Sequence, residues 1–323
     1  MSKRSLYIAG GVFLLLLAYV LFTQTGDRGF NTLNLPVLPQ IKAEKLTKIE
    51  ITTPAGSVIF EKQPAAWQIT SPIAFAADKN KLDSLTRLLG ELRITGLTSE
   101  RPEAAADFGL TTPTASTLRV SGENQQAWEL RVGQTDANQT HTYVQLPGDP
   151  KVYQVLGDIT QQLSRPATEW RSLQIFDFST DQALRVSIRQ SGQPAFEFTK
   201  EQETEAKIVA DTPQGTTPPA MTTRIVWKNQ TDGKALPDPA VNQFLNAFTR
   251  LSAARIADNA PASGKPLAVV AVATADKEYA LEVIRFLADT RQYLVQRKGE
   301  AVLYEIPEYQ GKNLLKEAKD FTP

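Results

Sequence analysis

A single histidine, His141, supplies all the imidazole chemistry that this chain has for acid–base work. Asp136 lies five residues before it, and a carboxylate at that spacing could orient the ring of a general base. Alternation of polar and apolar residues predicts that His141 and Tyr143 share one face at the end of a strand, beside a polar turn. The matching stretch in the second half of the chain, residues 290–292, reads Thr-Arg-Gln and has no histidine. We therefore interpret His141 as a solvent-facing hairpin residue and predict no catalytic residue.

Composition excludes several other kinds of site. The 323 residues contain no cysteine, which rules out disulfides, thiolate metal sites and a cysteine nucleophile, and one histidine cannot build a multi-histidine metal centre. The sequence also lacks a P-loop, a G-x-G-x-x-G turn after a strand, a G-x-S-x-G elbow and a calcium loop. We predict no cofactor and no metal. The 35 basic and 35 acidic residues balance, which argues against nucleic acid as a partner.

The N-terminus has the pattern of a membrane anchor. Lys3 and Arg4 precede an apolar run at 6–22, so we predict a cytoplasmic segment at 1–5, a transmembrane helix at 6–23 and a linker at 24–43. A cleaved signal peptide is the alternative, but residues 19–24 offer no A-x-A-like cleavage site. This predicts a single-pass protein of the bacterial inner membrane whose remaining domains are periplasmic or extracytoplasmic. The residues assigned to the anchor are Leu6, Phe13, Leu14, Leu15, Leu16, Leu17, Val20 and Phe22.

The rest of the chain carries an internal repeat. Short alternating strands surround a helix that starts near Asp78, and the same order returns around a second helix that starts at Asp238. Trp67 precedes Asp78 by the same spacing as Trp227 precedes Asp238. We predict an α+β fold with two similar domains, 44–178 and 179–323, each a mainly antiparallel sheet packed by a helix, with a mobile insertion at about 201–223. The predicted core positions of the repeat are Trp67, Leu85, Leu88, Trp227, Phe244 and Phe248.

Several motifs of the first copy form a recognisable series. They include Trp67-x-Ile69-x-x-Pro72, Phe108-Gly109-Leu110-x-x-Pro113, Leu130-x-Val132-Gly133 and Arg171-Ser172-Leu173. In order and spacing they resemble the uncharacterised domain-of-unknown-function 4340 family over roughly 46–178, and more weakly beyond. The resemblance implies a single-pass exported protein, often associated with gliding-motility-type ABC transporter systems, and it supplies no catalytic residues.

Three functional hypotheses remain open. The first is a non-enzymatic, membrane-anchored accessory or scaffold protein of an envelope complex, linked to an ABC-type transporter, that binds protein partners through a solvent-facing sheet face or an open sheet edge. The second is an exported module that binds a glycan or a lipid in a cleft between the two domains. The third is a hydrolase that uses His141.

Overall fold

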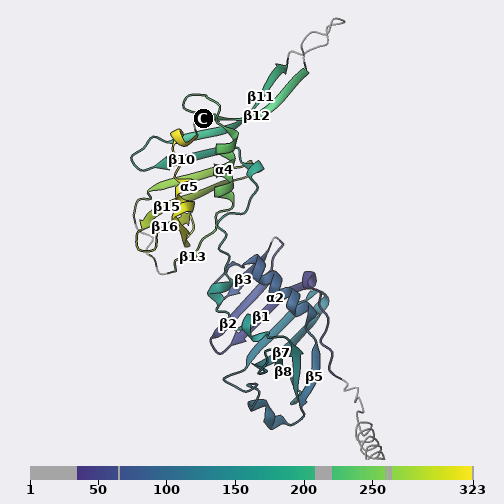
Figure 1. Cartoon of the computed structure of the whole chain (residues 1–323). Helices are drawn as coiled ribbons and strands as arrows, with labels where there is room; N and C mark the ends of the chain where they lie inside the picture. Colours follow the sequence, from purple (N-terminus) through teal and green to yellow (C-terminus); the bar gives the residue numbers. More distant parts are fainter. Residues whose placement is uncertain (1–34, 65, 208–219, 259, 261–263, 322–323) are drawn as a thin grey trace, which may run out of the picture. The chain divides into compact units, whose positions relative to one another are not determined.

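The computed structural model describes residues 35–64, 66–207, 220–258, 260 and 264–321. The chain divides into two compact units, Met1–Arg171 and Ser172–Pro323, called the first and second unit below (Figure 1). The predicted transmembrane helix at 6–23 and the flanking Lys3 and Arg4 lie outside the described residues. No helix in the described ranges is long and apolar enough to cross a bilayer.

The first unit is built on one antiparallel sheet with the strand order β4-β3-β2-β1-β6-β7-β8-β9-β5 (Figure 1). Its strands are β1 Leu46–Thr53, β2 Gly56–Lys62, β3 Trp67–Ser71, β4 Phe75–Ala76, β5 Ile94–Ser99, β6 Ser116–Gly122, β7 Ala127–Thr135, β8 His141–Gln145 and β9 Val152–Leu156. Its helices are α2 Lys79–Glu91 and α3 Thr160–Leu163, with short 3-10 turns at η1 Ala43–Lys45, η2 Pro102–Ala106, η3 Glu123–Gln125 and η4 Ala167–Trp170.

Helix α2 covers one face of this sheet. It begins at the predicted cap, where the Asp78 carboxylate accepts a hydrogen bond from the backbone N–H of Lys81 at 3.1 Å. Leu82, Leu85 and Leu89 are buried against strand residues of the sheet core, because their three- and four-residue spacing puts them on one side of the helix. The sheet face that is shielded from solvent is therefore the face against which the leucine side of α2 packs.

The opposite face of the sheet is lined by ion pairs within and between its strands. Lys48 Nζ lies 2.7 Å from Glu50 on the same strand, β1, and Arg119 Nε on β6 lies 2.6 Å from Glu129 on the neighbouring strand β7. Arg119 also approaches Glu50 at 4.0 Å. Pairs this exposed contribute little stability, but they keep the face soluble. This is the wet sheet face that the alternating sequence predicts.

The N-terminal part of the first unit differs from the prediction. The segment 24–43 was expected to be a linker, but Leu38 and Ile41 are buried in the core of the first unit. Ile41 lies so close to Gly122 that a Cβ on this glycine would come within 2.5 Å of Ile41 Cγ2. Pro36 and Pro39 favour an extended spacer, but Leu38 between them and Ile41 after them pack into the core of the first unit.

The segment between β5 and β6, residues 101–114, forms a lobe that is tied to the sheet by a close backbone approach. Gln134 N donates to Phe108 O at 2.9 Å, and the Phe108 ring packs on Tyr143 with ring centroids 4.5 Å apart. A Cβ at Gly133 would lie 2.1 Å from Phe108 O and 2.9 Å from Leu110 Cγ. Only a residue without a side chain fits between the lobe and β7 here.

We expect Gly133→Ala to destabilise this lobe by about 1–3 kcal/mol, the usual cost of an overpacked site. The added methyl meets a backbone oxygen, which cannot rotate away as a side chain would. Hydrogen exchange of Arg101–Thr114 should become faster in the variant, while Gly90→Ala in α2, where the nearest atoms to an added Cβ are 3.4 Å away, serves as the control. Unchanged exchange in Gly133→Ala would contradict the tight fit.

The second unit repeats the topology of the first. Its antiparallel sheet has the order β12-β11-β10-β14-β15-β16-β17-β13, which matches the first sheet strand for strand except that β4 has no counterpart among the described residues. Its strands are β10 Arg185–Gln190, β11 Phe196–Lys207, β12 Ala220–Asn229, β13 Arg255–Ile256, β14 Ala268–Ala273, β15 Glu278–Leu287, β16 Gln292–Arg297 and β17 Leu303–Pro307. Its helices are α4 Asp238–Thr249 and α5 Glu308–Leu314, with 3-10 turns at η5 Thr180–Gln182 and η6 Ala318–Phe321.

The boundary between the units lies earlier than the predicted 178/179. Residues from Ser172 onward belong to the second unit. Ile175 N donates to Leu251 O at 2.9 Å, and the Phe176 ring stacks on Phe248 with centroids 4.7 Å apart. Burial of these apolar side chains in the second core explains why the segment goes with that unit.

Candidate interaction surface

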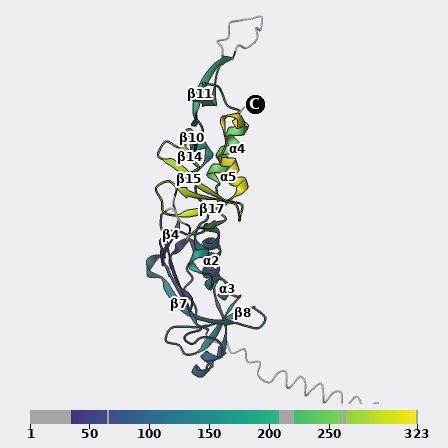
Figure 2. The same cartoon turned by 90° about the vertical axis from the view of Figure 1, so that its left-hand side faces the viewer.

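Both ends of the segment predicted to be a mobile insertion at 201–223 are strands, because 201–207 belong to β11 and 220–223 belong to β12. Residues 208–219 lie outside the described residues. β11 and β12 pair without a register shift from Phe198 with Asn229 to Lys207 with Ala220. β10, however, pairs with β11 only as far as Thr199, followed by one bond from Lys200 N to Leu184 O at 2.8 Å. Beyond that point the two strands run on together past the other strands of their sheet (Figures 1 and 2). We call residues 201–207 and 220–226 the ribbon.

The ribbon starts from a rigid base of aromatic side chains. Phe198 is fully buried and meets Trp227 edge-on, with ring centroids 5.6 Å apart. Phe321 of η6 and Phe244 of α4 close the same cluster, at 5.2 Å and 6.2 Å from the Phe198 ring. A core of interlocked rings leaves little freedom at this point, so the direction in which the ribbon leaves the sheet is fixed.

Alternate positions on one face of the β11–β12 pair, at the ribbon and its base, form a compact ion-pair network. Lys228 Nζ lies 2.9 Å from Glu203 and 3.2 Å from Glu201, and Arg224 lies 3.3 Å from the other Glu203 oxygen. The hydrogen bond from Lys228 is the main reason that the pKa of Glu203 is lowered, and Glu203 in turn raises the pKa of Lys228. These two acidic and two basic side chains therefore link β11 to β12 by ion pairs, and their charges cancel.

His141 and Asp136 do come together, as one polar turn between β7 and β8. Asp136 Oδ2 lies 3.3 Å from His141 Nδ1 and accepts from Thr140 Oγ1 at 2.7 Å. The Thr140 hydroxyl is the largest reason that the pKa of Asp136 falls to about 2. Asp136 and Thr140 lie in the turn between β7 and β8, and His141 is the first residue of β8, so the arrangement has the form of a turn-stabilising network. This position agrees with the interpretation of His141 as a hairpin residue.

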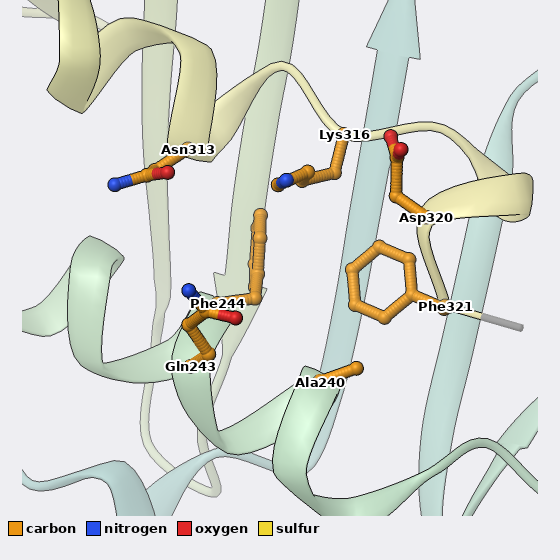
Figure 3. A pocket seen from close by; sticks show the side chains of 7 residues that line it. All are labelled: Ala240, Gln243, Phe244, Asn313, Lys316, Asp320 and Phe321. Carbon is orange, nitrogen blue, oxygen red and sulfur yellow. The ribbon is translucent and has the colours of Figure 1, made fainter. Parts of the chain in front are cut away.

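The second unit also contains a small pocket between α4, α5 and η6 (Figure 3). Its empty volume, which includes space open to solvent, is about 290 Å³. Phe244 and Phe321 provide its apolar wall, and both rings belong to the buried aromatic cluster. Its polar lining side chains are Gln243, Asn313, Lys316 and Asp320. Within the described part of the chain, no group of three or more His, Asp or Glu residues is arranged to hold a metal ion.

The other residues singled out from the sequence fall into two groups. Leu85, Trp227, Phe244 and Phe248 are buried, while Trp67 and Leu88 are half-buried and pack against the first core. The anchor residues, Leu6 to Phe22, lie outside the described residues. The ribbon is the candidate interaction element that sequence reasoning missed. A signal was present, because Thr, Val and Ile at 222–226 favour a strand, but the Thr- and Pro-rich stretch between the strands obscured it.

A buried phenol in the first unit gives a spectroscopic test of the structure. Tyr153 Oη donates to Asp149 Oδ2 at 2.7 Å, and burial followed by this hydrogen bond raises the pKa of Tyr153 to about 12. An unfolded tyrosine ionises near pH 10. The neutral phenol therefore stabilises the fold fully below about pH 10, and that contribution is lost as the pH rises through about 12.

We expect the ultraviolet difference titration between the native protein and Tyr153→Phe to show one phenol ionising near pH 12. Asp149→Asn should move that step toward pH 10, since the neighbouring negative charge is removed. A titration in which all eight tyrosines ionise together near pH 10 would show that Tyr153 is not enclosed.

Comparison with known proteins gives one match. A family model described as "Domain of unknown function (DUF4340)" matches residues 67–268, from the first residue of β3 to the first residue of β14. The match covers more than half of the chain and takes in parts of both units. No curated protein matches, and no solved structure matches.

Proposed function

From the premise that this chain belongs to the DUF4340 family, we propose that it is a non-catalytic, membrane-anchored scaffold that binds protein partners of an envelope complex. The observation that supports this most directly is the ribbon. Two strands that leave their own sheet bury little apolar surface, and an isolated two-stranded ribbon is at best marginally stable in water. A partner that pairs one of its own strands with an edge of the ribbon would stabilise the ribbon by backbone hydrogen bonds.

The proposed location follows from the N-terminal sequence. Lys3 and Arg4 before the apolar run at 6–22 favour a helix that keeps the N-terminus in the cytoplasm. Both units would then lie outside the cytoplasm, on a bacterial inner membrane, with 24–34 as the tether. The wet face of the first sheet and its ion pairs suit a surface exposed to water there.

The proposed partner is an ABC-type transporter, in which the permease would contact the ribbon outside the cytoplasm and the ATPase would be retained through the permease. This step rests on the resemblance of the motifs from Trp67 to Leu173 and on the ribbon as a docking element. The ribbon's near-neutral ion-pair face favours a partner held by backbone pairing and apolar contact over one held by net charge.

The test is affinity purification of the full chain in mild detergent from its native expression level. In the matched variant, residues 202–225 are replaced by Asn-Gly, a sequence suited to a two-residue hairpin turn after the pair Glu201–Val226. We expect the native chain to retain permease or ATPase subunits and the shortened chain to lose them, while His141→Ala, in the other unit, retains them. Recovery of the same proteins with the shortened chain, or of no other protein with the native chain, would contradict the proposal.

The second candidate function is binding of a glycan or lipid, and the pocket beside Phe244 and Phe321 is the observation that favours it. Trp227 and Phe321 both contact Phe198, so a ligand that displaced the Phe321 ring would change the emission of Trp227. Titration of Trp67→Phe/Trp128→Phe/Trp170→Phe with glycan fragments or lipid micelles isolates this signal. An unchanged Trp227 spectrum with every probe would remove this alternative.

A further inference from the structure

The backbone of the ribbon presents two edges, and the hydrogen-bond pattern shows which residues point outward along each. Gln230 N donates to Glu197 O at 2.9 Å, which makes this a hydrogen-bonded pair of the β11–β12 ladder. In an antiparallel ladder such pairs alternate with pairs whose N–H and C=O groups point away from each other. With the observed register, residues 202 and 204 of β11 and residues 223 and 225 of β12 direct their backbone groups outward.

Neighbouring hydrogen bonds agree with this alternation. On β12, Leu236 N donates to Trp227 O at 2.7 Å, and Asn229 N donates to Lys234 O at 3.0 Å, both from outside the ladder. These bonds occupy the outer edge of β12 only at its base. From Ala220 to Val226 no other described strand pairs with that edge.

The two edges differ in their protection against further pairing. Residues 201–207 of β11 read EQETEAK, in which four of seven residues are charged, and such charges are a common means of blocking an edge strand. Residues 220–226 of β12 read AMTTRIV, in which Arg224 is the one charged residue, and Glu203 pairs with it inside the ribbon. Ile225, with 52% of its surface exposed, lies on this open edge. The β12 edge contains no proline and no register shift.

We propose that the outer edge of β12, Ala220–Val226, pairs antiparallel with the same edge of a second copy of this chain, about a two-fold axis at Thr223. This inference deepens the proposed function, because it rests on the ribbon as a docking element and names one partner for one of its edges. The product is a four-stranded sheet in the order β11-β12-β12-β11.

The sequence of β12 is compatible with itself in this register. With Thr223 on the axis, Ala220 lies opposite Val226 of the second copy, so the whole open edge is used. Arg224 falls opposite Thr222 of the second copy, and no like charges face each other directly. If the two-fold axis lay at Arg224, the Arg224 residues of the two copies would lie opposite each other and repel. The sequence of β12 therefore favours the register with the axis at Thr223 over this one.

The pairing surface is small, so anchoring contributes to the dimer. Seven residues per copy bury much less than a standard interface, and two free chains in dilute solution would pair weakly. Two chains held in one membrane by the proposed N-terminal anchor would meet at a high effective concentration, which favours the pairing without further contacts.

The first test blocks each edge separately in the full chain in mild detergent. Thr223→Pro removes an outward N–H of β12, and Thr204→Pro removes an outward N–H of β11, while both leave the internal ladder bonds of the ribbon intact. We expect light scattering at high protein concentration to show a dimer for the native chain and for Thr204→Pro, and half that mass for Thr223→Pro. A monomeric native chain, or equal masses for the two variants, would overturn the proposal.

The second test traps the pair and does not depend on a proline variant that folds. The chain has no cysteine, so Thr223→Cys introduces a single thiol. Opposite residues of a hydrogen-bonded pair lie about 5.5 Å apart at Cα, within the range that a disulfide spans. Oxidation of intact cells with copper-phenanthroline should convert Thr223→Cys to a disulfide-linked dimer and leave Thr204→Cys monomeric. Equal cross-linking of both variants, or of neither, contradicts pairing at the β12 edge.

These outcomes separate this inference from the function on which it rests. Co-purified transporter subunits with no dimer would remove the second-copy proposal alone. A Thr223-dependent dimer that retains no other protein would leave the pairing in place and remove the envelope-complex function.

Discussion

Phe198→Ala is expected to destabilise the second unit by about 3–5 kcal/mol, the cost of truncating a fully buried phenylalanine. The Phe198 side chain has no exposed surface and touches Trp227, Phe244 and Phe321, which come from three different elements. Its removal leaves a cavity at the base of the ribbon that rings held from several sides cannot fill. We therefore expect the ribbon and η6 to lose order together.

Hydrogen exchange measured peptide by peptide reports this effect without assuming a single unfolding transition. Protection in β10–β12 and η6 should fall, while peptides of the first unit keep native exchange. Ile225→Ala is the control, because its side chain is half exposed and its truncation removes little buried surface. A Phe198→Ala protein with native protection in β11 would contradict the role given to the aromatic cluster.

Trp170→Ala is expected to destabilise the first unit to a similar extent, about 3–5 kcal/mol. The Trp170 indole is fully buried, meets the Phe60 ring edge-on at 5.1 Å and has the Arg165 guanidinium 5.7 Å from its ring centroid. Trp170 O also accepts from Asp78 N at 2.7 Å, at the residue that caps α2. The variant should lose protection in α2 and β2 and keep it in the second unit.

Trp170→Phe separates packing from hydrogen bonding at the same position. The buried indole N–H has no hydrogen-bond partner among the described residues, so its removal costs no bond. We expect the phenylalanine variant to lose clearly less stability than the alanine variant, measured by urea unfolding followed at Trp67 and Trp128. Equal losses for both variants would contradict the interpretation that Trp170 stabilises the first unit mainly by packing.

The helices and most strands could be predicted from the sequence because each is buried on one side, and its apolar residues therefore recur at regular spacing. Leu82, Leu85 and Leu89 recur at helical spacing, and both helices start within one residue of the expected Asp. The repeated spacing of Trp and Asp led to the internal repeat, and the matching strand order of the two sheets now gives that repeat a structural basis.

The missed features lack such a period. β5, Ile94–Ser99, follows α2 almost directly, and its alternation is broken by Gly96 and by two register shifts against β9. Consecutive residues of the ribbon, Glu201 and Gln202 on β11 and Thr223, Arg224 and Ile225 on β12, are exposed, so they need not alternate between apolar and polar. Its outward backbone groups, on which the pairing proposal depends, follow from ladder register, which depends on contacts between distant residues and leaves no local pattern.

The shared topology of the two sheets has a consequence for how the chain folds. In the first sheet β5 pairs with β9, although β6, β7 and β8 come between them in the chain. In the second sheet β13 pairs with β17, although β14, β15 and β16 come between them. Each of these edges therefore forms only after the four strands that follow β5 or β13 have been synthesised. Contacts of this kind are slow to form because a long loop must first be ordered. A chain with two sheets of one strand order also offers each unfinished sheet a near-equivalent strand from the other unit, a known route to misassembly between repeats. Synthesis from the N-terminus reduces this kinetic risk, since every strand of the first sheet has left the ribosome before β10 follows.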